Sequence, residues 1–455
     1  MRARYLAELR QLARLALPLV LAQFAQMAMG FVDTVMAGRV SPVDLAAVAI
    51  GGSVWFPVFL FITGVLMAVT PVVAQHFGAG ALKEIPAVLR QGIWIAIALG
   101  LTGLLLLRNM EWLLAWLGLE PEVQRLAAGY LQAIAWGLPA MAIFQALRCF
   151  SEGVSRTRPI MLIGFLGLAC NIPANYILIY GKLGLPALGG VGCGWASALV
   201  MWVMMLALAA LISYSGGYRF LPPLLGWARP DWARLGRLVR LGFPIGIAMF
   251  IETSVFAVIA LLVGSLGAVV VAGHQVALNF TSLLFMVPLS ISMAITVRVG
   301  QAVGRGEPAA ARFSALCGTT FTMLVAVIFA SAILLLAPAI AAIYTPDPEV
   351  RRVAAGLLFF AALFQISDAA QVSASGALRG YKDTRVPMLI TFFAFWFIGL
   401  PTGYLLGLGD WPGLHLGASG FWIGLVVGLT TAAALHGLRL WRIAGHRLGF
   451  GSAYS

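Results

Sequence analysis

Charged residues are scarce in this chain. Only 10% of its 455 residues are Asp, Glu, Lys or Arg, whereas 61% are hydrophobic and the mean hydropathy is +0.97. Water-soluble domains carry about 25% charged residues, so this composition excludes one. The sequence therefore predicts an integral membrane protein.

Cysteine and histidine are also rare, with four and five copies. The cysteines have no C-x-x-C spacing and fall in apolar segments, which excludes a disulfide framework and a zinc site. The motifs H-E-x-x-H and G-x-S-x-G are absent, and GGVGCG at 189–194 leads into an apolar helix without a preceding strand. We predict that the protein is not an enzyme and needs no cofactor.

Long apolar runs fill most of the chain. A spanning helix needs about 20 apolar residues, and about twelve such runs occur, which predicts an all-α polytopic membrane protein. They lie near 12–37, 48–75, 88–107, 125–150, 159–180, 189–213, 238–263, 274–300, 310–337, 352–378, 387–408 and 416–438.

The net charge of +13 follows membrane topology and does not indicate a nucleic-acid partner. With both termini and every second loop in the cytoplasm, most of the 29 Lys and Arg fall on that side. This is the positive-inside bias. The basic residues left outside are Arg39, Arg108, Arg125, Lys182, Arg351 and Arg352.

The chain contains an internal repeat. A shift of 226 positions lays LARLALPLVLAQF, which starts at Leu12, over LVRLGFPIGIAMF, which starts at Leu238, and aligns Pro18 with Pro244. The basic and apolar N-terminal segment resembles a signal peptide. Because the repeat includes this segment, we expect it to be part of the folded structure.

Each repeat holds six predicted helices, so both copies enter from the same side. Parallel repeats of this kind are related by a pseudo-twofold axis along the membrane normal, which suggests a central cavity and alternating access. We predict an N-lobe over 1–213, a cytoplasmic linker over 214–236, a C-lobe over 237–443 and a cytoplasmic tail over 444–455.

Three acids lie inside apolar spans: Asp33, Glu252 and Asp368. Insertion scales assign about 2.5–3.5 kcal/mol to a central Asp, so such residues indicate function. Helix rise places Glu252 and Asp368 about 16–18 Å above the cytoplasmic end, at one level. No basic residue is predicted at that depth, so these carboxylates must take protons, metal cations or organic cations. Asn171 and Asn175 share one helix face.

The segments FVDTVMAG, PVVAQHFGAG, LGGVGCGWASALV, FIETSVFAV, VAGHQVALNF and GALRGYKDT resemble the NorM branch of the multidrug and toxic compound extrusion (MATE) transporters over nearly the whole chain. The resemblance implies two six-helix lobes in a bacterial inner membrane. It implies export of cationic, amphiphilic drugs in exchange for protons or sodium ions, and we expect a monomer.

The resemblance also implies site residues. The cation-coupling set is Glu252, Asp368, Asp33, Asn171, Asn175 and Ser197. The drug-binding set is Ser53, Glu252, Phe256, Gln275, Phe285, Asp347 and Asp368. Sodium would bind at Glu252 and Asp368, or at Asp33, Asn171 and Asn175. Phe364 and Phe285 lack hydroxyls that some relatives carry, and this loss of oxygen ligands favours protons over sodium.

Two other functions of polytopic membrane proteins fit the sequence less well. A lipid-linked precursor flippase of the same superfamily is the alternative, but an anionic pyrophosphate would require buried basic residues, whereas the buried charges predicted here are acids. An ion channel is disfavoured because a few asymmetric acids do not form a ring-like filter.

Overall fold

The computed structural model describes residues 2–224, 226, 228–409 and 416–449, and within these ranges the regular structure is entirely helical. Helices α1 (Arg2–Gly38) and α10 (Trp232–Gly264) begin the two repeats. Between them lie α2 (Pro42–Leu66), α3 (Val69–Gly78), α4 (Ile85–Arg108), α5 (Glu111–Trp116), α6 (Pro121–Ala135), α7 (Leu138–Gly153), α8 (Arg158–Tyr180), α9 (Gly190–Tyr214) and η1 (Gly216–Tyr218). After them follow α11 (Ala268–Gly304), α12 (Pro308–Tyr344), α13 (Pro348–Gly380), α14 (Arg385–Phe392), η2 (Phe393–Gly399), α15 (Leu400–Leu408) and α16 (Ala418–Gly449).

The number of spans agrees with the sequence. Among the described residues, 11 helices are long and apolar enough to cross a membrane, and the count reaches 12 if the bent pair α6 and α7 forms one span. These two helices meet at 46° across a short break. The predicted span at 125–150 is therefore broken in two.

Polar caps and prolines explain where several helices begin. The Ser41 hydroxyl accepts a hydrogen bond from the Asp44 backbone N–H at the start of α2, and Pro42 supplies the preset φ of the first helical turn. Helix α8 ends at Gly181, which adopts a φ of 67°, a left-handed conformation that terminates helices.

The chain divides into two compact units, and the division falls inside two helices. The N-terminal unit is Leu17–Gly246, and the C-terminal unit is Met1–Ala16 with Ile247–Ser455. Residues 1–16 join the C-terminal unit because Leu12 packs in its core and Glu8 forms an ion pair with Arg298, with an Oε2 to Nη2 distance of 2.7 Å. The first helix of each repeat thus starts in the unit built mainly from the other repeat.

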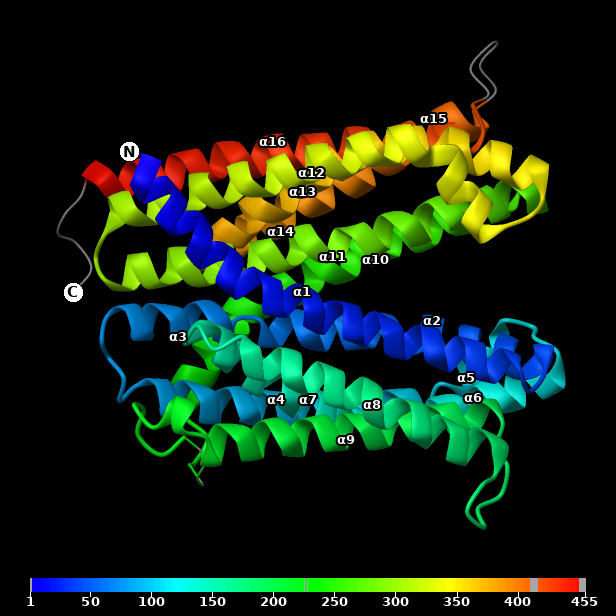
Figure 1. The fold of residues 1–455 in the computed structure, drawn as a ribbon, viewed down its shortest axis with the longest axis horizontal. Coiled ribbons are helices and arrows are strands. Elements are labelled where there is room, and N and C mark those ends of the chain that lie inside the picture. The colour runs from blue at the N-terminus through cyan, green and yellow to red at the C-terminus, as the bar shows by residue number, and fades with distance from the viewer. Residues whose placement is uncertain (1, 225, 227, 410–415, 450–455) are drawn as a thin grey trace. The chain divides into compact units, whose positions relative to one another are not determined.

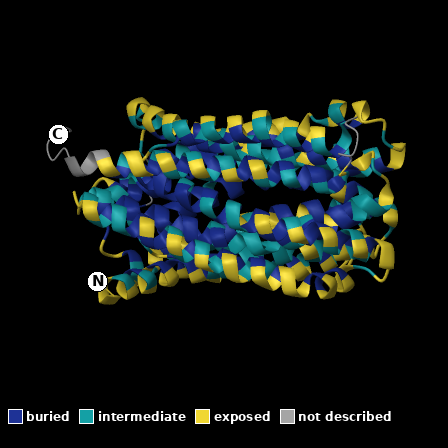
Figure 2. Cartoon of the chain, turned by 90° about the horizontal axis from the view of Figure 1, so that it is seen from above, coloured by how far each residue is buried: buried dark blue, intermediate teal, exposed yellow. Residues whose placement is uncertain are grey.

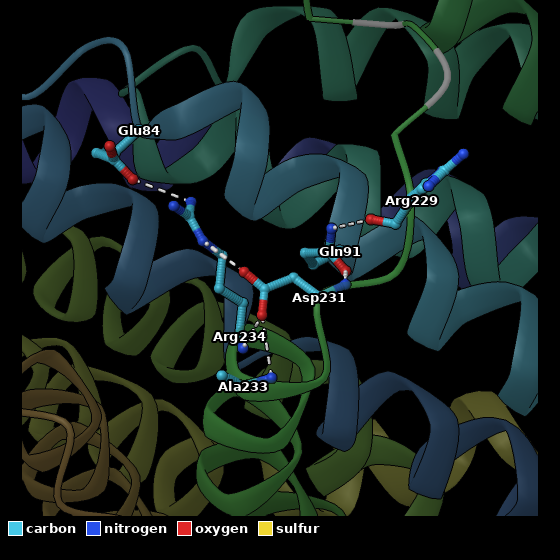
Figure 3. A network of polar contacts seen from close by, with 6 residues as sticks. All are labelled: Glu84, Gln91, Arg229, Asp231, Ala233 and Arg234. Carbon is cyan, nitrogen blue, oxygen red and sulfur yellow. Dashed lines mark hydrogen bonds and ion pairs between the residues drawn. The ribbon is translucent and has the colours of Figure 1, made fainter.

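The segment between the repeats is bound to the N-terminal unit (Figure 3). The Gln91 amide donates to the Arg229 carbonyl at 3.1 Å and accepts from the Asp231 backbone N–H at 3.0 Å. Arg234 then bridges Asp231 and Glu84 through ion pairs of 3.1 and 3.0 Å. These bonds fix the linker end and the start of α10 to α4 and the turn before it.

Asp231 caps the start of α10. Its carboxylate accepts from the backbone N–H groups of Arg234 and Ala233, and these bonds, that to Arg234 foremost, hold the pKa of Asp231 below its usual value. The lobe boundaries at 213 and 237 remain a prediction from the repeat, and the compact units divide the chain elsewhere. The predicted tail is described only as far as 449.

Equivalent hydrogen bonds in the two units support the repeat. The Thr70 hydroxyl donates to the Cys149 carbonyl at 3.3 Å, and the Thr296 hydroxyl donates to the Gly376 carbonyl at 2.8 Å. Each residue of the second bond lies 226 or 227 positions after its counterpart. A side-chain bond between distant helices has therefore been kept in both copies.

Backbone conformations repeat in the same way. Ser155 and Lys382 both have φ 62°, and Gly80 and Gly306 have φ 70° and 73°. Positive φ is uncommon outside glycine, so its recurrence at matched turns reflects the same local fold in both copies.

In the C-terminal unit, α13 packs against α11, α12 and α16 (Figure 1). Fully buried residues such as Trp422 and Phe421 form the centre of its core, and Figure 2 shows buried and exposed positions on many of the helices. Three glycines of α16 form a packing face: Gly420, Gly424 and Gly428 lie against the backbone of Gly407, Gly403 and Gly399.

Substitution of Gly424 by Val is expected to lower the free energy of unfolding by about 1–3 kcal/mol, because a Cβ there would overlap the Gly403 backbone. Thermal unfolding of the purified protein in detergent measures the effect. Gly437→Val, on the same helix but with no neighbouring atom within 4 Å of its Cβ position, is the control. Equal destabilisation by both variants would contradict close packing at Gly424.

Candidate functional site

Glu252 on α10 and Asp368 on α13 lie close enough in the C-terminal unit for their charges to interact. Phe256 lies one turn beyond Glu252 on α10, and Phe364 lies one turn before Asp368 on α13. The rings of Phe256 and Phe364 contact edge to face, with centroids 6.1 Å apart. Because these two helices run in opposite directions there, the contact places both acids at one level, in agreement with the sequence-based depth.

No described residue donates a hydrogen bond or ion pair to either carboxylate. Asp368 is only 2% exposed and Glu252 is half-buried. The adjacent hydroxyls of Thr253 and Ser254 donate to the carbonyls of Met249 and Ile251. The hydroxyls therefore hydrogen-bond within their own helix, and the charges of the two carboxylates repel each other.

Arg379 is the nearest basic residue that acts on this pair. It attracts Glu252 electrostatically from the far end of α13, while its Nη2 donates to the Ser292 hydroxyl at 2.9 Å. Arg379 is buried, at 8% exposure. Arg379 lies in the last turn of α13, as expected for a basic residue at a helix end, and it acts on Glu252 over distance, without forming an ion pair with it.

Asp33, in the N-terminal unit, differs from this pair because its carboxylate accepts several hydrogen bonds. Its Oδ1 accepts from the amides of Asn171 at 3.0 Å and Asn175 at 2.6 Å, and its Oδ2 accepts from the Ser197 hydroxyl at 3.1 Å. The Asn175 amide also donates to Asn171 Oδ1 at 3.1 Å. The structure therefore brings all four predicted first-lobe residues together on α1, α8 and α9.

The two acidic sites differ in whether hydrogen-bond donors already stabilise their negative charge. The Asp33 carboxylate is held by three neutral donors, which stabilise its charge. The pair of Glu252 and Asp368 has no hydrogen-bond donor among the described residues and carries two like charges that repel each other, so a proton or a cation must compensate it. Within the described residues, no group of three His, Cys, Asp or Glu could hold a metal ion.

The predicted drug-binding residues differ in their burial and in their hydrogen bonds. Phe256 and Phe285 are half-buried, and Ser53 and Gln275 are exposed on α2 and α11. Asp347 is exposed and has a structural role, because its Oδ1 accepts from the backbone N–H groups of Glu349 and Val350 and caps α13. Their assignment to drug binding remains a prediction.

The sequence analysis missed a buried ion pair on α7. Arg148 Nε lies 2.9 Å from Glu152 Oε1, and both side chains are almost fully buried. Arg148 also donates to the Gln23 amide oxygen at 3.1 Å, and the Thr70 hydroxyl donates to Glu152 at 3.4 Å. The spacing of Arg and Glu four residues apart was a signal that could have revealed the pair.

Asp44 was also missed. Its Oδ1 accepts from the Gly190 backbone N–H at 2.6 Å, so the carboxylate caps the start of α9. Gly189 has φ 55°, and a Cβ there would overlap the same carboxylate. The start of the glycine run at 189–194 therefore forms a tight turn with close packing.

Comparison with known proteins identifies relatives over nearly the full length. The family model MatE matches residues 18–177 and 244–405. The chain is 52% identical over 439 residues to "Multidrug resistance protein PmpM" of Pseudomonas aeruginosa, covering 96% of this chain and 92% of that protein. It is 48% identical over 438 residues to "Multidrug resistance protein MdtK" of Yersinia pseudotuberculosis, with 96% of both chains covered.

Solved structures share the fold. A crystal structure of a eukaryotic MATE transporter superposes with a TM-score of 0.87 at 22% identity, covering 98% of this chain and 99% of that one. An outward-facing multidrug resistance MATE family transporter gives a TM-score of 0.87 at 20% identity, covering 97% and 96%.

Proposed function

The chain belongs to the MATE family of membrane transporters, and on this basis we propose that it is a secondary antiporter that exports cationic, amphiphilic drugs. Two relatives that match almost end to end carry the name multidrug resistance protein. The protein is a multi-span membrane transporter and not an enzyme. We propose protons as the coupling ion, with sodium as the alternative, and no other cofactor.

The observation that carries this proposal is the unsatisfied carboxylate pair of Glu252 and Asp368. A drug cation and a proton can each neutralise it, and they compete because both use the same oxygens. Protonation from outside would release the drug, and the protonated carrier would return inward. Asp33, with its own donors, would act as a second cation site together with Asn171, Asn175 and Ser197.

The driving force follows from the stoichiometry. Exchange of one proton for one monovalent drug moves no net charge, so each pH unit supplies about 1.4 kcal/mol, or tenfold accumulation. A second proton per cycle would add the membrane potential, at about 2.3 kcal/mol per 100 mV.

The proposed location is the inner membrane of a bacterium, with both termini in the cytoplasm and the protein acting as a monomer. The positive-inside distribution of Lys and Arg supports this orientation, and the bacterial relatives support the membrane.

Ethidium transport in everted vesicles tests the function and the ion. An imposed pH gradient without sodium is expected to drive at least fivefold accumulation, and a sodium gradient at matched pH on both sides is expected to drive none. Vesicles from cells that carry the Glu252→Gln variant control for passive uptake. Accumulation driven by sodium alone would contradict proton coupling, and no accumulation under either gradient would contradict drug antiport.

A further inference from the structure

Gln365 is a fully buried polar side chain with no partner. It lies on α13 at 0% exposure, and neither its amide oxygen nor its amide nitrogen bonds to any described residue. Buried polar atoms without a hydrogen bond are costly and rare in folded proteins. A glutamine in this condition needs a partner that some state of the protein supplies.

The position of Gln365 identifies that partner. It precedes Asp368 by three residues, so the two side chains are neighbours on one face of α13. Ser367, between them, turns to another helix and hydrogen-bonds the Thr430 hydroxyl at 2.8 Å. Gln365 and Asp368 therefore combine an amide without partners and a carboxylate without donors, one helical turn apart.

Two polar side chains of α11 are the other candidates for a hydrogen-bond partner of Asp368. On α11, which packs against α13, the Thr281 hydroxyl donates to the Ala277 carbonyl at 2.7 Å. The buried His274 accepts from the Trp422 indole N–H at its Nδ1, so its Nε2 carries the proton, and this nitrogen has no partner among the described residues. The other charged groups around the site are Glu252 on α10 and Arg379 at the end of α13.

A carboxamide suits a carboxyl group that changes its protonation state. An ionised carboxylate can only accept hydrogen bonds, whereas the protonated form also donates one. The amide has a donating and an accepting end, and rotation of the amide by half a turn exchanges them. Donation from a side-chain amide to a carboxylate already occurs in the N-terminal unit, where two asparagine amides donate to Asp33.

We propose that Gln365 is a third member of the site formed by Glu252 and Asp368, and that its amide donates to the ionised Asp368 and accepts from the protonated one. This inference rests on the proposed antiport. It makes Gln365 a positioning residue that keeps Asp368 hydrogen-bonded in both states.

The test is the pH at which protons displace bound ethidium from the purified transporter, followed by fluorescence polarisation. Q365M removes the amide at nearly constant volume. The hydrogen bond to the ionised carboxylate is the stronger of the two, so loss of the amide destabilises the ionised Asp368 more than the protonated one. We therefore expect protons to displace the drug from Q365M at about a tenfold lower concentration, one pH unit higher, and the drug affinity at high pH to stay within about threefold of that of the unmodified protein. Gln145→Met, which replaces a buried glutamine of the N-terminal unit, is the control and should leave the midpoint unchanged.

Equal midpoints for Q365M and the unmodified protein would overturn the proposal. If Q365M does not fold, infrared difference spectroscopy of the unmodified protein decides: the carbonyl band of protonated Asp368, assigned by its loss in Asp368→Asn, should lie in the hydrogen-bonded range, and a band of a free carboxyl group would overturn the role. If sodium and not protons displaces the drug, proton coupling fails, and the sodium midpoint of Q365M then tests Gln365 separately.

Discussion

Replacing Glu252 by Gln or Asp368 by Asn is expected to lower pH-driven drug efflux at least tenfold. Each substitution keeps the shape of the side chain and removes the charge that a proton or drug cation must neutralise. Because neither carboxylate has a donor among the described residues, neither has a structural bond to lose. Ethidium efflux from whole cells, normalised to the amount of protein in the membrane, gives the measurement.

A matched acid separates this effect from a general loss of negative charge. Glu349, exposed in the first turn of α13, lies on the same helix as Asp368, and Glu349→Gln should retain normal efflux. Near-normal efflux in both Glu252→Gln and Asp368→Asn would remove the proposed site, whatever the control shows.

Replacing Arg148 by Ala is expected to destabilise the protein by about 3–5 kcal/mol, because it leaves the buried Glu152 carboxylate without its counter-charge. The Thr70 hydroxyl, at 3.4 Å, is too weak a donor to compensate. The loss should appear as a large fall in the unfolding temperature in detergent and in a reduced yield of folded protein.

Two controls define what the Arg148 result means. The double variant Arg148→Met with Glu152→Gln removes both charges together, and it should recover most of the lost stability. Arg305→Ala breaks an exposed pair with Glu307 and should change stability by less than about 1 kcal/mol. A loss for Arg148→Ala as small as that for Arg305→Ala would show that the buried pair does not stabilise the fold.

The helices and the repeat were predictable because they depend on local patterns. Apolar runs of membrane length and prolines at helix starts are readable residue by residue, and the match of Pro18 with Pro244 survives in the sequence. The depth of Glu252 and Asp368 followed from helix rise alone, since a straight helix converts residue number into distance.

Contacts between distant segments were less predictable. The sequence suggested that Asn171 and Asn175 share a face, but the donation of both amides to Asp33 depends on how α1 packs against α8. The attachment of the linker through Gln91 and Arg234 could not be foreseen, since these residues look like ordinary helix-end polar groups.

By itself the sequence determined that this is a membrane protein of repeated six-helix halves with three acids in apolar spans, because hydrophobicity and helical periodicity are local properties of a chain in a bilayer. Only the tertiary structure decided which acid is satisfied and which is not. Hydrogen-bond partners come from helices far apart in the chain, so packing sets both the donors of Asp33 and the lack of a donor to Asp368 within the described part of the chain.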